Sequence, residues 1–317
     1  MPNPGYRLLV LDLDGTLLDA RGQLPEAHRR AVQTVRRQGV EVLIATGRDW
    51  DAMLDVYRAL GLSTPAITIA GAQIVDSDGR VLKEHRMHPD AVAAIESAAE
   101  AAGASLVAVQ DSGLSLGTRR ADDFGPWEIW NPWTRIVGEP LARHRGGKLP
   151  LFMAVYGKRS CEALLPLAPA LPDTQWELWA PRDDEHVLYL WHRDANKGTA
   201  LAEFCAARGY RPEEVVAMGD ALLDLSMLSW AGTGVAMAAA PDEVKRVCAL
   251  VTEPDDPHPV ATALWRLGLT PTLEPDGRAV AGTAGPGHEG IRLGGPPGGG
   301  AKGLPEELPG GPQGGEA

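Results

Sequence analysis

Two aspartates, one residue apart, follow an apolar segment near the start of the chain. The apolar run Leu8–Leu11 leads into a DLDGT motif whose acidic residues are Asp12 and Asp14. Unpaired buried charge is costly, so carboxylates at the end of a buried strand favour a chemical role. Residues i and i+2 of a strand point to the same side, so we expect both to face one ligand at the carboxyl edge of a sheet. A simple acidic turn is the alternative, because Asp-Gly is a common turn pair.

Three further motifs follow at long range. Thr46 and Gly47 come directly after a second predicted strand, and Lys197 opens a predicted helix. Asp220 follows a third predicted strand, and Asp224 comes four residues after it. In this order the four motifs resemble those of the haloacid dehalogenase-like hydrolase superfamily, and within it the Cof-type phosphatases. The resemblance covers about residues 6 to 268, ahead of the Gly/Pro-rich end.

The elements that must position these motifs alternate between strand and helix. The first group comprises strand 6–13, helix 25–38, strand 40–45, helix 49–60 and short strands 66–70 and 73–76. The last group comprises helix 197–208, strand 215–218, helix 222–230, strand 234–237 and helix 241–248, and residues 259–267 close the fold. This alternation predicts a parallel sheet with helices on both faces.

Between the two groups the rhythm changes to an alanine-rich helix at 89–102 and several β-like runs. The predicted fold class is α/β: a doubly wound parallel-sheet (Rossmann-like) core of residues 1–81 and 191–270. An inserted α/β cap domain is expected at 82–190, as the resemblance also implies. His186 and His192 flank a predicted cap strand and carry no predicted role.

The end of the chain differs in composition. From residue 271 to residue 317, 23 of 47 residues are Gly or Pro, and no hydrophobic period is visible. This composition is typical of segments that cannot bury enough apolar surface to fold. We therefore expect a disordered Gly/Pro-rich tail at 271–317.

The motif residues could carry out phosphoryl transfer, which needs a nucleophile, an acid for the leaving oxygen and cations for the negative charge. Asp12 is the candidate nucleophile, giving an aspartyl-phosphate, and Asp14 the candidate acid and base. Thr46 and the backbone at Gly47 are candidate phosphate donors ahead of a helix N-terminus. Lys197 is a cation able to bridge phosphate and Asp12.

Two carboxylates facing a phosphate dianion would repel it, and Mg²⁺ is a hard cation that prefers oxygen ligands. The resemblance implies that Mg²⁺ is held by the Asp12 side chain, the Asp14 backbone carbonyl and the Asp220 side chain. Asp224 is expected to support the metal shell or Lys197. The expected activity is Mg²⁺-dependent hydrolysis of a small phosphorylated metabolite, such as a sugar phosphate. A phosphotransferase or phosphomutase with the same intermediate and a low-turnover phospho-ligand-binding regulatory protein are the alternatives.

Three positions depart from the Cof-type pattern. Ala70, Leu223 and Ala239 stand where relatives usually carry asparagine. Each change removes one hydrogen-bond donor and one acceptor, so we expect altered phosphate positioning or an altered metal shell.

The composition excludes several partner classes. A net charge of -12 and a pI near 5.1 argue against nucleic acid or an anionic membrane as partner. The three cysteines form no CxxC pair, which favours a reducing compartment. The sequence shows no signal-peptide pattern and no apolar run approaching the ~18 residues of a membrane span, so a cytoplasmic location is expected. The oligomeric state is not predicted.

Overall fold

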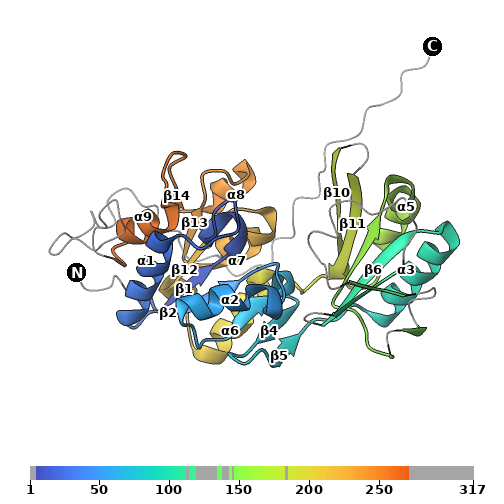
Figure 1. The fold of residues 1–317 in the computed structure, drawn as a ribbon, viewed down its shortest axis with the longest axis horizontal. Helices are drawn as coiled ribbons and strands as arrows, with labels where there is room; N and C mark the ends of the chain where they lie inside the picture. The colour runs from blue at the N-terminus through green and yellow to red at the C-terminus, as the bar shows by residue number, and fades with distance from the viewer. Residues whose placement is uncertain are drawn as a thin grey trace, which may run out of the picture.

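The chain folds around two sheets (Figure 1). A computed structural model describes residues 5–111, 114–118, 134–137, 143–144, 146–182 and 185–270. Within these residues the first sheet has the strand order β14-β13-β12-β1-β2-β3-β4-β5 and the second the order β10-β11-β9-β6-β7-β8. The predicted tail at 271–317 lies outside the described residues.

The first sheet is parallel from β14 to β3 and antiparallel at the β4–β5 edge. Its strands are β1 (Leu8–Leu11), β2 (Glu41–Ala45), β3 (Ala66–Thr68), β4 (Gln73–Val75), β5 (Val81–Glu84), β12 (Val215–Gly219), β13 (Thr233–Ala236) and β14 (Leu250–Val251). All four residues of β1 are buried, as a strand covered on both faces requires.

Helices cover both faces of this sheet. They are α1 (Glu26–Arg37), α2 (Trp50–Leu60), α6 (Lys197–Arg208), α7 (Leu225–Trp230), α8 (Asp242–Val247) and α9 (Pro259–Arg266). Leu9 and Leu11 share one apolar cluster with α1, α2 and α9, whereas Leu8 and Val10 share another with α6, α7 and α8. Because successive side chains of a strand point to opposite faces, the side chains of one short apolar strand pack against the helices on both sides of the sheet. The doubly wound fold is confirmed.

The second sheet is antiparallel except where β7 pairs with β8. Its strands are β6 (Ser105–Asp111), β7 (Leu114–Gly117), β8 (Thr134–Ile136), β9 (Phe152–Tyr156), β10 (Thr174–Arg182) and β11 (Glu185–His192). One face is covered by α3 (Pro89–Ala102), α5 (Lys158–Leu164) and the short 3₁₀ helix Leu165–Ala170. This layered α/β unit, on the right of Figure 1, is inserted between β5 and α6.

Three local expectations are wrong. The first strand ends at Leu11 rather than at residue 13, and Leu13–Leu17 form a π-type turn in which Gly15 has a φ of 82°. The strand expected at 66–70 stops at Thr68, and Ile69–Gly71 form a 3₁₀ turn. Third, the sheet was expected to be parallel, but β4 runs antiparallel to β3 because this turn reverses the chain.

The predicted division at residues 81 and 82 falls inside β5, which pairs with β4 of the first sheet. The second sheet in turn continues through His192, past residue 190. The division into domains itself stays a prediction. Among the described residues, every helix is too short or too polar to cross a membrane.

Candidate active site

Three strands of the first sheet end side by side at its carboxyl edge. Leu11 pairs with Ile44 of β2 and with Met218 of β12. Asp12 follows β1, and its backbone N–H donates to the Met218 carbonyl (3.1 Å). The residues after β2 and β12 therefore flank Asp12, and this edge is where open α/β sheets place ligand sites.

A buried lysine joins two carboxylates from different motifs. Lys197 Nζ donates to Asp12 Oδ1 (2.6 Å) and to Asp224 Oδ1 (2.5 Å). The side chains of Lys197, Asp12 and Asp224 are 3%, 7% and 0% exposed. Such charged groups persist in a core only when they are paired and hydrogen-bonded, so this cluster holds the three motifs in fixed geometry.

The loop that carries Asp220 is fixed from two sides. Asp224 Oδ2 accepts from the backbone N–H groups of Asp220 (2.9 Å) and Ala221 (3.0 Å). Thr16 Oγ1 donates to Asp220 Oδ1 (2.7 Å). A Cβ at Gly15 would lie 2.3 Å from an Asp220 oxygen, so only glycine lets the DLDGT turn approach this carboxylate. Asp224 thus supports both Lys197 and the Asp220 loop.

Asp14 lies apart from this cluster. Its carboxylate accepts from Arg48 Nε (2.8 Å) and Nη2 (2.5 Å), a bidentate pair in which Asp14 is 48% and Arg48 27% exposed. Because β1 ends at Leu11, the expectation that Asp12 and Asp14 share one face of a strand is wrong. The π-type turn instead directs Asp14 to the loop after β2.

That loop contains Thr46 and Gly47. Thr46 is fully buried, and its Oγ1 accepts the Arg48 backbone N–H (3.1 Å). Asp49 caps the N-terminus of α2 by accepting from Ala52 N–H (2.8 Å). The two predicted phosphate-binding residues therefore lie just ahead of a capped helix start, beside the strand that leads to Asp12.

The 3₁₀ turn at residues 69–71 connects this loop to the start of α6. Ala70 N–H donates to the Thr46 carbonyl (3.0 Å). A Cβ on Gly71, whose φ is 101°, would lie 2.2 Å from the Asn196 carbonyl carbon. Glycine therefore lets the turn pack closely against the first residues of α6, the helix that begins at Lys197.

Burial and mutual repulsion set the electrostatics of the cluster. Burial raises the pKa of Asp12 to about 7, with Lys197 opposing and the neighbouring Asp224 and Asp220 adding to the rise. Burial also raises the pKa of Asp220, against the hydrogen bond from Thr16. Burial alone would lower the pKa of Lys197, but the Asp12 and Asp224 carboxylates raise it above its ordinary value.

The donor set fits a hard divalent cation. One carboxylate oxygen from each of Asp12, Asp220 and Asp224 lies within 4.8 Å of the others. Three carboxylates against the single Lys197 ammonium leave excess negative charge, and all three offer only oxygen, the ligand atom that Mg²⁺ prefers. Since both Asp224 oxygens are already hydrogen-bonded, Asp12 and Asp220 are the side chains best placed to hold an ion.

The chain resembles known proteins over most of its length. A family model described as haloacid dehalogenase-like hydrolase matches residues 9–124 and 174–264. The chain belongs to this family. It is 30% identical over 267 residues to pyridoxal phosphate phosphatase YbhA of Escherichia coli, covering 75% of this chain and 90% of that protein. It is 27% identical to phosphatase YwpJ of Bacillus subtilis over 288 residues, covering 82% and 99%.

A solved structure of a hypothetical protein from Geobacillus kaustophilus matches with a TM-score of 0.72 and 27% identity, over 84% of this chain and all of that one. This structural match covers both sheets. With named phosphatases among its relatives, this hydrolase is placed with the phosphoric monoester hydrolases.

The three departures from the Cof-type pattern lie in different settings. Ala70 adopts a left-handed conformation (φ 52°, ψ 27°), which asparagine tolerates better than alanine. Leu223 is 45% exposed in the 3₁₀ turn Leu222–Asp224, so it does not pack in the core. Ala239 is exposed. Among these three departures, only Ala70 adopts a backbone conformation that is unfavourable for its residue type, and the sequence did not reveal this.

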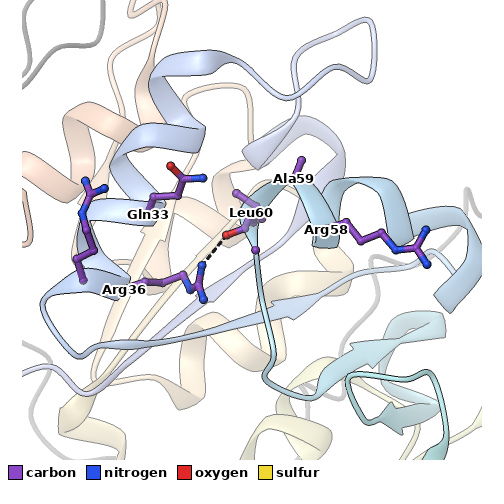
Figure 2. Close-up of a pocket in the computed structure, with 7 residues that line it drawn as sticks. Gln33, Arg36, Arg58, Ala59 and Leu60 are labelled. Atoms are coloured by element: carbon purple, nitrogen blue, oxygen red, sulfur yellow. Dashed lines mark hydrogen bonds between the residues drawn. The ribbon is translucent and has the colours of Figure 1, made fainter.

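A hollow on this hydrolase lies away from the carboxyl edge. Figure 2 shows Arg36, Arg58 and Leu60 at the C-terminal ends of α1 and α2, where Arg36 Nη1 donates to the Leu60 carbonyl (2.7 Å). Cationic side chains at helix C-termini are stabilised by the helix dipole. This hollow contains none of the motif residues, so we assign it no part in the chemistry.

Proposed function

We propose that this hydrolase is a Mg²⁺-dependent phosphatase that cleaves a small phosphorylated metabolite through an aspartyl-phosphate on Asp12. The observation that carries the proposal is the buried Asp12–Lys197–Asp224 cluster beside Asp220 at the carboxyl edge of the sheet. A buried carboxylate that accepts from a lysine, which Asp224 also holds in place, is prepared for nucleophilic attack.

In the first step, an Asp12 oxygen attacks the phosphorus and the bond from phosphorus to the ester oxygen breaks. Asp14 gives its proton to the leaving oxygen. In the second step, Asp14 takes a proton from water, the water oxygen attacks the same phosphorus, and the bond to Asp12 breaks. Both steps use one nucleophile and one acid–base residue, and they leave the enzyme unchanged.

The other motif residues bind and orient. Lys197 holds Asp12 in one rotamer and offers a cation to the phosphoryl oxygens. Thr46 and the Gly47 backbone lie ahead of the α2 N-terminus, where an anion is favoured. Asp14 is half exposed, so it can exchange its proton with solvent and with the substrate.

Asp12 and Asp220, with the backbone carbonyl of Asp14, would hold Mg²⁺. When bound, the ion would offset the negative charge of the carboxylates and the phosphate. The relative that acts on pyridoxal phosphate supports a small phosphorylated compound as substrate, and a sugar phosphate is of similar size and charge.

The experiment is a screen of sugar phosphates, pyridoxal phosphate and other phosphomonoesters, measuring inorganic phosphate with Mg²⁺ and with chelator. We expect turnover of at least one compound with Mg²⁺, and its loss in chelator and in Asp12→Asn, which keeps the shape of the side chain. Full activity of Asp12→Asn would overturn the aspartyl-phosphate. Phosphate transfer to added alcohols in place of water would favour a phosphotransferase, and binding without turnover a regulatory protein.

A further inference from the structure

Two histidines and an aspartate meet where the chain crosses between the two sheets. His85 directly follows β5 of the first sheet, and His192 is the last residue of β11 of the second. Asp194 lies in the turn between β11 and α6. One potential ligand atom from each of the three residues lies within 4.8 Å of the other two.

The backbone fixes both segments that carry these residues. His85 N–H donates to the Ala72 carbonyl of the first sheet's turn (2.8 Å), and Met87 N–H to the Pro150 carbonyl (2.9 Å). On the other crossing, Ala195 N–H donates to the His192 carbonyl (2.8 Å). The cluster therefore joins the two segments that connect the sheets, which are far apart in sequence.

The side chains are already arranged as a pair of imidazoles with carboxylates beside them. The His85 and His192 rings stack with centroids 5.7 Å apart and planes at 27°. His192 Nδ1 lies 3.9 Å from Asp194 Oδ2, and His85 Nε2 lies 3.4 Å from Glu203 Oε2. The imidazoles are 16% and 20% exposed, whereas Asp194 is 58% exposed and opens the cluster to solvent.

We propose that His85, His192 and Asp194 form a binding site for a divalent transition-metal ion of the zinc type, separate from the Mg²⁺ site. Imidazole nitrogen favours zinc and related ions over magnesium, which prefers oxygen alone. Ligand atoms on one tetrahedral zinc ion are about 3.4 Å apart, so rotation of exposed Asp194 and small ring movements bring the three atoms together. Glu203, on α6, is the carboxylate that would orient His85, a common partner of metal-bound histidine.

The chain contains a matched pair that lacks the second histidine. His88 and Asp90 have the same spacing as His192 and Asp194, with His88 Nδ1 3.8 Å from Asp90 Oδ2. In both pairs the aspartate N–H donates to the histidine Nδ1, at 3.2 Å and 3.1 Å. Turn formation alone therefore explains the His-x-Asp spacing but not the stacked His85 beside His192.

The test is a zinc titration of the full-length, tag-free chain by calorimetry near neutral pH, with Mg²⁺ in excess to occupy the oxygen site. We expect one zinc ion per chain. His85→Gln and His192→Gln should each weaken zinc affinity by at least about tenfold. Even the loss of a hydrogen-bond partner of a metal ligand costs about that much, and these histidines are ligands themselves. His88→Gln is the matched control and should bind like the unmodified chain, as should Asp12→Asn.

Thermal melts with and without zinc accompany each titration, because a ligand that binds only the folded state raises the melting temperature. If a histidine variant fails to fold, Asp194→Asn and the cobalt absorption spectrum of the unmodified chain replace it, and nitrogen ligation must appear in that spectrum. Equal zinc affinity in His85→Gln, His192→Gln and His88→Gln would overturn the proposal. Loss of zinc binding in Asp12→Asn would also overturn it, by placing the ion at the catalytic carboxylates.

Discussion

Asp12 and Asp14 belong to one short motif, and each is paired with a cation from a distant motif, yet their environments are opposite. The Asp12–Lys197–Asp224 cluster is almost entirely buried, whereas the Asp14–Arg48 pair is a quarter to a half exposed. Breaking a buried ion pair leaves an uncompensated charge in the core, whereas an exposed pair exchanges easily with water. We infer that the first pair fixes the proposed nucleophile, and that the second can open when Asp14, the proposed acid and base, exchanges a proton.

The largest effect should come from removing the buried cation. Lys197→Met keeps the apolar stem but leaves the Asp12 and Asp224 carboxylates without their ammonium, so we expect a loss of about 3–5 kcal/mol in unfolding free energy. Urea unfolding measures it. Arg48→Met, which breaks the exposed pair, is the control and should cost about 0–1 kcal/mol. Equal losses in the two variants would remove the contrast between the two environments.

The exposed pair should matter for rate rather than for folding. Asp14→Asn removes the proposed acid and base but leaves the core cluster intact, so we expect turnover to fall by about 10²–10⁴-fold. Its unfolding free energy should change by less than about 1 kcal/mol. Steady-state kinetics on the substrate found in the screen, together with urea unfolding, measures both. A variant that loses several kcal/mol of stability but keeps its turnover would assign Asp14 a structural role.

The buried cluster should also make stability depend on pH when Mg²⁺ is chelated. Because the pKa of Asp12 is raised to about 7 in the folded chain, the folded state keeps a proton that the unfolded state loses near pH 4. Stability should therefore be fullest below about pH 4 for this group and fall between about pH 4 and 7, by up to about 1.4 kcal/mol per pH unit. Urea unfolding across that range, with Asp12→Asn as control, measures the slope. An equal slope in Asp12→Asn would show that Asp12 is not the group that titrates.

The smallest effect concerns the turn that supports Thr46. Asparagine at position 70 would relieve the left-handed alanine, so Ala70→Asn should raise the unfolding free energy by about 0.5–1 kcal/mol. Ala239→Asn restores another family asparagine at an exposed position and should change stability by less than about 0.5 kcal/mol. Thermal melts of the two variants compare them directly. A gain at residue 239 as large as at residue 70 would mean that backbone conformation is not the cause.

Much of the fold and part of the candidate site could be predicted from the sequence. Apolar strands alternating with helices predicted the parallel sheet, and the polar residues after β1, β2 and β12 predicted the edge where Asp12, Thr46 and Asp220 gather. These features depend on local periodicity and on strand ends, which neighbouring residues determine. Asp224 was expected to support either the metal shell or Lys197, and the structure shows that its carboxylate accepts from Lys197.

Tertiary structure alone decided the partners of the remaining side chains. The π-type turn after Leu11 places Asp14 beside Arg48. Ala70 adopts its left-handed conformation in the turn that packs against the start of α6. The sequence did not single out His85 and gave His192 no role. The two side chains meet because both segments that connect the sheets pass the same place. Periodicity determines which residues are buried, but contacts between distant segments depend on how the sheets and turns pack, and no local pattern encodes that packing.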